Sequence, residues 1–181
     1  MRTEVTTWYL EMLQPDQLQA APCPRADVRV ERAAIPSPEL SRFLYTAVGG
    51  MWYWLDRLSW DYARWLDYLN RAEVETLVLH VSGTPAGYIE LEAQPNDNVE
   101  VASFGLLPRF IAQRLGGYLL SVGVPNRLGG GCAAGLGAHV QPGRPDSTGE
   151  LPGARFSRLR TAHGMAGPAG SFAWAVARRR L

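Results

Sequence analysis

The sequence predicts one α/β domain in which a mostly antiparallel sheet is flanked by helices. Short apolar or alternating runs, typical of strands, are interspersed with segments of helical periodicity. A tight turn at Ser82-Gly83-Thr84-Pro85 joins two of the strand-like runs into a hairpin. A chain of 181 residues, 46% of them hydrophobic, suits a single domain of this class.

The first third of the chain predicts two strands and a helix. Residues 3–12 are rich in β-branched and aromatic side chains, and residues 28–31 alternate like a core strand. A proline-containing connection separates these two runs. Ser37 can cap a helix that has Pro38 in its first turn. The expected apolar face of this helix, followed by its glycine stop, is Leu40, Phe43, Leu44, Ala47, Val48, Gly49 and Gly50.

An aromatic segment follows, and a second helix is expected within it. Ser59 is placed to cap this helix. Its predicted buried face is Tyr62, Trp65, Leu66 and Leu69. The aromatic residues of the segment, which predict core packing, are Trp52, Tyr53, Trp54, Trp60, Tyr62, Trp65 and Tyr68.

The centre of the chain predicts a hairpin, a third strand and a helix that begins with glycines. Residues 76–81 form a nearly continuous apolar strand, and residues 86–92 return beside it. Residues 99–104 alternate as the next strand, which Pro108 ends. The following helix should bury Leu115, Tyr118, Leu119 and Val122. Gly116 and Gly117, in its first turn, would let an anion such as a pyrophosphate approach the backbone N–H groups.

Residues 99–120 resemble the acetyl-CoA-binding core of the GNAT superfamily of acyl-CoA N-acyltransferases. That core is a strand, a Leu/Val-x-Pro exit and then Arg/Gln-x-x-Gly-x-Gly/Ala at the start of a helix. Gly116 matches the last glycine, whereas Arg114 and Ile111 depart from the pattern. The flanking Phe-Gly-Leu-Leu-Pro and Leu-Gly-Gly-Tyr-Leu-Leu strengthen the resemblance, which extends upstream to about residue 38.

The resemblance implies an N-acetyltransferase with acetyl-CoA as co-substrate and a small-molecule or protein amine as acceptor. Pantetheine would pair with the strand near Leu106 and Leu107. The catalytic base would be a strand glutamate, with Glu100 first and Glu90 second, although either could be an ordinary solvated carboxylate. The family's general acid, a tyrosine on the last helix, is absent from the written sequence. Pyrophosphate would lie on the amides of Ala112, Gln113, Arg114, Leu115, Gly116 and Gly117.

The family places the linker between its first two helices over the acceptor site. Core packing is therefore not the only interpretation of the aromatic segment. The linker residues that could instead face an acceptor are Trp52, Trp54, Asp56 and Arg57.

Composition limits the partners. A formal charge of +1 gives no reason to expect nucleic-acid or membrane binding. The three histidines have no ligand spacing, so no metal is expected. Two cysteines and no signal-like start favour the cytoplasm. A homodimer is also allowed.

The character of the chain changes after residue 124. Residues 125–181 hold eleven of the 19 glycines and five of the 13 prolines, and no apolar strand follows where the family has its next core strand. We therefore divide the chain into a GNAT-like part, 1–124, and an irregular tail, 125–181. The sequence alone leaves the sheet ending at residues 99–104, with the C-terminal strands missing or degraded.

The tail allows a sharper hypothesis than disorder. All 18 basic residues are Arg, which suggests GC-rich coding. With such codons, a one-base shift across residues 149–159 permits Gly-Asn-Tyr-Gln-Ala-Arg-Gly-Phe-Arg-Val-Tyr, and Asn-Tyr-x-x-x-Gly-Phe is a signature of the family's last helix and strand. The same shift across 136–145 permits a strand and a turn. We hypothesise a slip of the reading frame near residues 123–131. The alternative functions are a non-catalytic acyl-CoA binder or inactive remnant, and an aromatic-rich interaction module without affinity for CoA.

Overall fold

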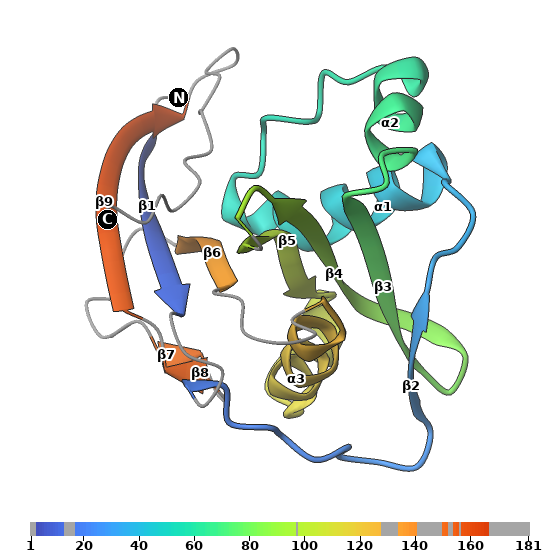
Figure 1. Cartoon of the computed structure of the whole chain (residues 1–181). Coiled ribbons are helices and arrows are strands. Elements are labelled where there is room, and N and C mark those ends of the chain that lie inside the picture. The colour runs from blue at the N-terminus through green and yellow to red at the C-terminus, as the bar shows by residue number, and fades with distance from the viewer. Residues whose placement is uncertain are drawn as a thin grey trace.

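The computed structural model describes residues 3–12, 17–96, 98–127, 134–140, 150–151, 154–155 and 157–166. It contains a seven-stranded sheet in the order β2-β3-β4-β5-β6-β1-β9, in which only the β5–β6 pair is parallel (Figure 1). The strands are β1 Thr3–Met12, β2 Val28–Arg32, β3 Val74–Val81, β4 Thr84–Gln94, β5 Asn98–Leu106, β6 Ala134–Val140 and β9 Ser157–Ala166. Two short strands, β7 Glu150–Leu151 and β8 Ala154–Arg155, pair separately. The helices are α1 Pro38–Gly49, η2 Gly50–Trp52, α2 Tyr62–Leu69, η3 Pro108–Phe110 and α3 Leu115–Arg127. The expected mixed, mostly antiparallel α/β class is confirmed.

The hairpin between β3 and β4 forms as predicted, but its turn is shorter than expected, because Thr84 and Pro85 already belong to β4. Ser82 and Gly83 both have positive φ, +48° and +79°. Two successive left-handed residues are the requirement of a type I′ turn, whose twist matches that of the flanking strands. The turn therefore sets the pairing of β3 with β4.

The helix starts follow local capping rules, with one correction. The hydroxyl of Ser37 accepts a hydrogen bond from the Leu40 amide at 3.2 Å, as predicted for α1. The cap of α2 is Asp61 rather than Ser59, because the Asp61 carboxylate accepts from the Arg64 amide at 2.8 Å. A carboxylate also complements the positive end of the helix, which a serine hydroxyl cannot do with charge.

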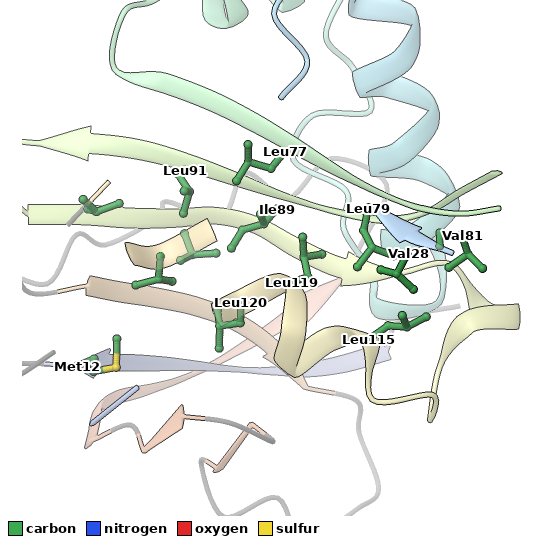
Figure 2. Packing of buried hydrophobic residues seen from close by; sticks show 14 residues of the cluster. Met12, Val28, Leu77, Leu79, Val81, Ile89, Leu91, Leu115, Leu119 and Leu120 are labelled. Carbon is green, nitrogen blue, oxygen red and sulfur yellow. The ribbon is translucent and has the colours of Figure 1, made fainter. Parts of the chain in front are cut away.

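Helix α3 packs on one face of the sheet and builds the larger core (Figure 2). The buried face of α3 differs from the predicted one. Tyr118 and Val122 are only half-buried. Gly123 explains the rotation, because a Cβ there would lie 3.0 Å from Ile89 Cγ2, so the missing side chain lets α3 approach β4. The buried residues of the helix are Leu115, Leu119, Leu120 and Val124.

Helices α1 and α2 cover the opposite face and bury part of the aromatic segment. Trp65 is 2% exposed and its ring meets those of Tyr45 and Trp60 edge-on. Trp54 packs against Gly49 at the end of α1. Phe43 and Tyr62, expected on the buried faces of their helices, are exposed instead. The aromatic side chains therefore pack chiefly as a second core, although not through every predicted residue.

The sheet continues past β5, which corrects the expectation that it ends there. β6 pairs with β5, β1 lies between β6 and β9, and all three strands are on the side of β5 remote from β2 (Figure 1). β6 reads Ala-Gly-Leu-Gly-Ala-His-Val, which lacks the alternating large apolar residues of a recognisable strand. Its backbone can still join a ladder, because ladder hydrogen bonds do not involve side chains.

Candidate active site

The outer edge of β5 is only partly covered by β6. The two strands pair at Val99, Glu100 and Val101. From residue 102 onward, β5 has no ladder partner on this edge among the described residues, while β6 continues along β1 to Val140. The two parallel strands therefore share their starts and separate toward their carboxyl ends. An open strand edge can take an extended ligand through main-chain hydrogen bonds.

A β-bulge lies where the two strands separate. Leu91 pairs with Val101 and Glu90 pairs with Ser103, so Ala102 is an extra residue in β5. A bulge leaves its extra residue out of the ladder and bends the strand. Glu100 precedes this bulge by two residues, so it lies where β5 turns away from β6.

Leu106 and Leu107, the two residues expected to contact pantetheine, direct their backbone amides to opposite edges of β5. The amide of Leu107 donates to the Ala86 carbonyl of β4 at 2.8 Å. Successive N–H groups of a strand point to opposite edges, so the amide of Leu106 is directed to the open edge. Leu106 therefore fits a main-chain contact with a ligand, and the amide of Leu107 does not.

The loop after β5 presents a row of backbone amides, which we call the amide cradle (residues 112–117). Ala112 and Arg114 have left-handed backbones, with φ of +65° and +61°. Ala112, Gln113 and Arg114 are exposed, and no cradle amide donates to another described residue. The first N–H groups of a helix also carry the positive end of its dipole. This row is suited to a phosphate or pyrophosphate.

Gly116 places the first turn of α3 against the end of β5. A Cβ at Gly116 would lie 3.8 Å from Leu106 Cδ1 and 3.8 Å from Phe104 Cζ, which is ordinary van der Waals contact. Packing therefore allows a methyl group at this position. A larger or charged side chain would extend from the cradle itself, and this difference makes Gly116 a useful position for testing ligand binding.

Three glutamates, Glu90, Glu92 and Glu100, project from the face of β4 and β5 that lies opposite α3. Glu92 and Glu100 are cross-strand neighbours, and Glu90 lies two residues from Glu92. The Gln94 side chain donates from Nε2 to Glu100 Oε2 at 3.1 Å. Burial and the charge of Glu92 raise the pKa of Glu100 above its usual value, against an opposing effect of Arg57. A carboxylate with a raised pKa is a better proton acceptor from an amine than a fully solvated one.

Glu90, the second candidate base, is enclosed by other side chains. It is 1% exposed, and its Oε1 accepts from Arg57 Nη1 at 2.6 Å and from the Tyr68 hydroxyl at 2.9 Å. Burial of the Arg57 guanidinium acts to lower its pKa, but Glu90 and Tyr68 outweigh this effect and hold the pKa above its ordinary value. The rings within 6 Å of this guanidinium belong to Tyr45, Trp60, Trp65 and Tyr68.

The burial of the α1–α2 linker distinguishes the two interpretations of its residues, core packing and contact with an acceptor. Arg57 is 6% exposed and Trp54 is 8% exposed, so both belong to the α1–α2 core rather than to a ligand-facing surface. Trp52 is half-buried against the same core. For Trp54 and Arg57, the packing interpretation therefore holds.

Several elements of the site gave no sequence signal. The left-handed backbones of the cradle occur at Ala112 and Arg114, where neither glycine nor asparagine marks them. The Gln94–Glu100 contact depends on the pairing of two strands, and the Tyr68–Glu90 contact joins a helix to a strand. An i, i+2 pattern of polar residues on a strand, Glu90, Glu92 and Gln94, was the signal that could have pointed to this face.

Two kinds of feature are absent from the part of the chain that the structure describes. None of the helices in the described part is long and apolar enough to cross a membrane. Within the same residues, no group of three or more His, Cys, Asp or Glu side chains is arranged to hold a metal ion.

Comparison of this geometry with solved structures identifies the fold. A GCN5-related N-acetyltransferase from Kribbella flavida matches with a TM-score of 0.54 and 20% identity, over 93% of this chain and 61% of that one. One from Sphaerobacter thermophilus gives 0.62 and 15%, over 90% and 51%. An aminoglycoside acetyltransferase from an uncultured soil metagenomic sample gives 0.52 and 13%, over 68% and 82%. The chain therefore has the GNAT-type acyltransferase fold.

These similarities have a limited extent. The chain spans 61% of the Kribbella flavida structure and 51% of the Sphaerobacter thermophilus structure. No family model and no curated protein matches the sequence.

Proposed function

We propose that this chain is an N-acetyltransferase that moves an acetyl group from acetyl-CoA to a primary amine. The observation that carries the proposal is the continuity of three features along β5. Glu100 precedes the bulge, the open edge follows it, and the amide cradle begins beyond the end of the strand. One extended ligand with a phosphate at one end could contact the edge and the cradle together.

The residues present suit acetyl-CoA. The main chain of Leu106 would pair with pantetheine, and the cradle amides would hold the pyrophosphate. Residues 107–118 contain no Asp or Glu, so no carboxylate in this stretch opposes a phosphate. The CoA thioester supplies the activated acetyl group, and the chain orients it toward the amine.

The proposed reaction balances with one base. The amine nitrogen attacks the thioester carbonyl carbon, an N–C bond forms, the C–S bond breaks, and CoA leaves as its thiolate. Glu100 takes the proton that the nitrogen loses, directly or through a water molecule, and this proton then passes to the thiolate, so that CoA is released as its thiol. Glu90 would instead anchor the α1–α2 linker, because its Oε1 already accepts from Arg57 and Tyr68.

The acceptor is proposed only as a class, a primary amine on a small molecule or a protein. One structural neighbour is described as an aminoglycoside acetyltransferase, so aminoglycosides belong in the first panel of amines. We place the reaction in the cytoplasm, the compartment that the cysteine content favours.

A second candidate is an acyl-CoA binder without turnover, or an inactive remnant of such an enzyme. Arg114 favours it, because this side chain extends from a cradle position at which the family usually has glycine. The absence of any tyrosine after Tyr118 also favours it, because the usual general acid is then missing.

Thiol release from acetyl-CoA in the presence of an aminoglycoside, a polyamine and a peptide tests the proposal. We expect turnover with at least one amine, and a loss of about 100-fold in Glu100→Gln with unchanged affinity for acetyl-CoA. Glu31→Gln, whose side chain is 69% exposed on β2, is the matched control and should keep full activity. Saturable binding without turnover would favour the second candidate, and absence of binding would contradict both.

A further inference from the structure

The connection that precedes β2 lies along α3. Near the middle of α3, the Ala21 amide donates to Ser121 Oγ at 2.8 Å. One turn nearer the cradle, the Cys23 side chain lies near Tyr118, and its Sγ donates to the Arg25 carbonyl at 3.1 Å. Two residues further on, Arg25 brings the connection to the cradle. We call residues 21–27 the α3 strap.

Arg25 is the strap residue that reaches the cradle. Its Nη1 donates to Gln113 Oε1 at 3.4 Å. Asp27 fixes the guanidinium from the other side, through Nε–Oδ1 at 2.9 Å and Nη2–Oδ2 at 3.0 Å. Ser82 donates to Asp27 Oδ2 at 2.6 Å, and the hydrogen bonds from Ser82 and Arg25 lower the pKa of Asp27. An ionised carboxylate therefore holds Arg25 in place.

The guanidinium keeps binding capacity in this position. Of its five N–H groups, three are used by Asp27 and Gln113, which leaves one on each terminal nitrogen without a partner among the residues that the structure describes. The side chain is 42% exposed. One N–H group on each of the two terminal nitrogens of a guanidinium matches two oxygens of a phosphate monoester.

Gln113 ties Arg25 to the cradle through both ends of its side-chain amide. Its Oε1 accepts from Arg25, and its Nε2 donates to the Arg109 carbonyl at 2.8 Å. The side chain of Gln113 is thus a link between the strap and η3, while its backbone amide stays in the cradle row. This places the free edge of Arg25 beside the cradle rather than inside it.

The surroundings of the cradle are positively charged. Residues 17–29 and 107–118 together contain four arginines, and Asp27 is their one acidic residue. The arginines are Arg25, Arg29, Arg109 and Arg114. A ligand with several phosphates would find both backbone amides and cationic side chains on this side of the molecule.

We propose that Arg25 binds the 3′-phosphate of the acyl-CoA substrate. This inference rests on the proposed function. The cradle amides account for the pyrophosphate, and CoA has one more phosphate, a monoester on the ribose beyond it. That group carries about −1.5 to −2 charges at neutral pH and offers the paired oxygens that the free edge of Arg25 fits.

Isothermal titration of the full chain with CoA and with 3′-dephospho-CoA tests this assignment without turnover. We expect the unmodified chain to bind CoA at least about fivefold more tightly than dephospho-CoA. Arg25→Gln should lose most of this preference by weakening CoA alone. Arg42→Gln removes an exposed arginine of α1, on the opposite face of the sheet from α3, and should keep the preference.

Each alternative result has a distinct meaning. Equal affinity of the unmodified chain for both ligands would overturn the inference and leave the proposed function standing. Equal weakening of both ligands in Arg25→Gln would also overturn it, because Arg25 would then only attach the strap to the loop. No CoA binding at all would overturn the inference together with the function. If Arg25→Gln fails to fold, Arg25→Lys keeps a charge but loses the fork, and an unchanged preference in that variant would overturn the inference.

Discussion

Glu90→Gln should be one of the most destabilising isosteric changes in the chain. The carboxylate and its partner Arg57 are 2% and 8% exposed, and their atoms lie 2.6 Å apart. Removing one member of a buried pair leaves an uncompensated charge and costs roughly 3–5 kcal/mol. The glutamine carbonyl can still accept a hydrogen bond from Arg57, and the four rings around the guanidinium stay in place. We therefore expect a loss of about 3 kcal/mol in the free energy of unfolding.

Urea denaturation of the full chain measures this loss against a matched control. Glu73 forms an exposed pair with Arg71 at 3.7 Å, and Glu73→Gln should cost less than about 1 kcal/mol. Combining Glu90→Gln with Arg57→Met should cost less than the sum of the single losses, because the buried charge is then gone. The reasoning would be refuted if the double variant lost as much unfolding free energy as the two single variants together. It would also be refuted if Glu90→Gln lost no more than Glu73→Gln.

Three further predictions concern Glu100, Arg114 and the tail. Because burial and Glu92 raise the pKa of Glu100 above 4.5, the folded chain binds this proton more tightly than the unfolded chain. The unmodified chain should therefore lose stability relative to Glu100→Gln as pH rises through the raised pKa, and match it below about pH 4, as urea titrations would show. Arg114→Gly should stabilise the loop by about 0.5 kcal/mol, because its φ is +61°, and should weaken CoA binding by removing a cation; tighter binding would show that Arg114 obstructs the cradle. The gene should contain a continuous frame shifted by one base that encodes Asn-Tyr-Gln-Ala-Arg-Gly-Phe, and its absence would disprove the slipped-frame hypothesis.

The parts of the fold that the sequence predicts are those with local causes. Ser37 caps α1 and Ser82-Gly83 turns the hairpin, because both signals act within a few residues. The helical period predicts an apolar face of α3 that is rotated about the helix axis from the face that the structure buries. The period alone fits two faces, and the close approach of Gly123 to Ile89 selects one of them.

The parts that the sequence does not predict depend on long-range pairing. Arg57 and Glu90 are 33 positions apart, and nothing near either residue indicates its partner. Arg25 and Gln113 are 88 positions apart and meet only because the strap follows α3. The sequence does not predict β6, because its glycine and alanine residues give no alternation of large apolar and polar side chains. The position of Glu100 beside the bulge likewise follows from the register of β4 and β5.

Titration of the full chain with acetyl-CoA, in parallel with two variants at Gly116, tests the central claim most directly. A Cβ fits at this position, 3.8 Å from Leu106 and Phe104, so Gly116→Ala should fold and bind as the unmodified chain does. Gly116→Asp places a carboxylate on the cradle and should weaken binding at least tenfold, or about 1.4 kcal/mol. We predict saturable binding of acetyl-CoA that is weaker in Gly116→Asp and unchanged in Gly116→Ala. No binding, or equal affinity in a folded Gly116→Asp variant, would contradict the assignment of the cradle to acetyl-CoA.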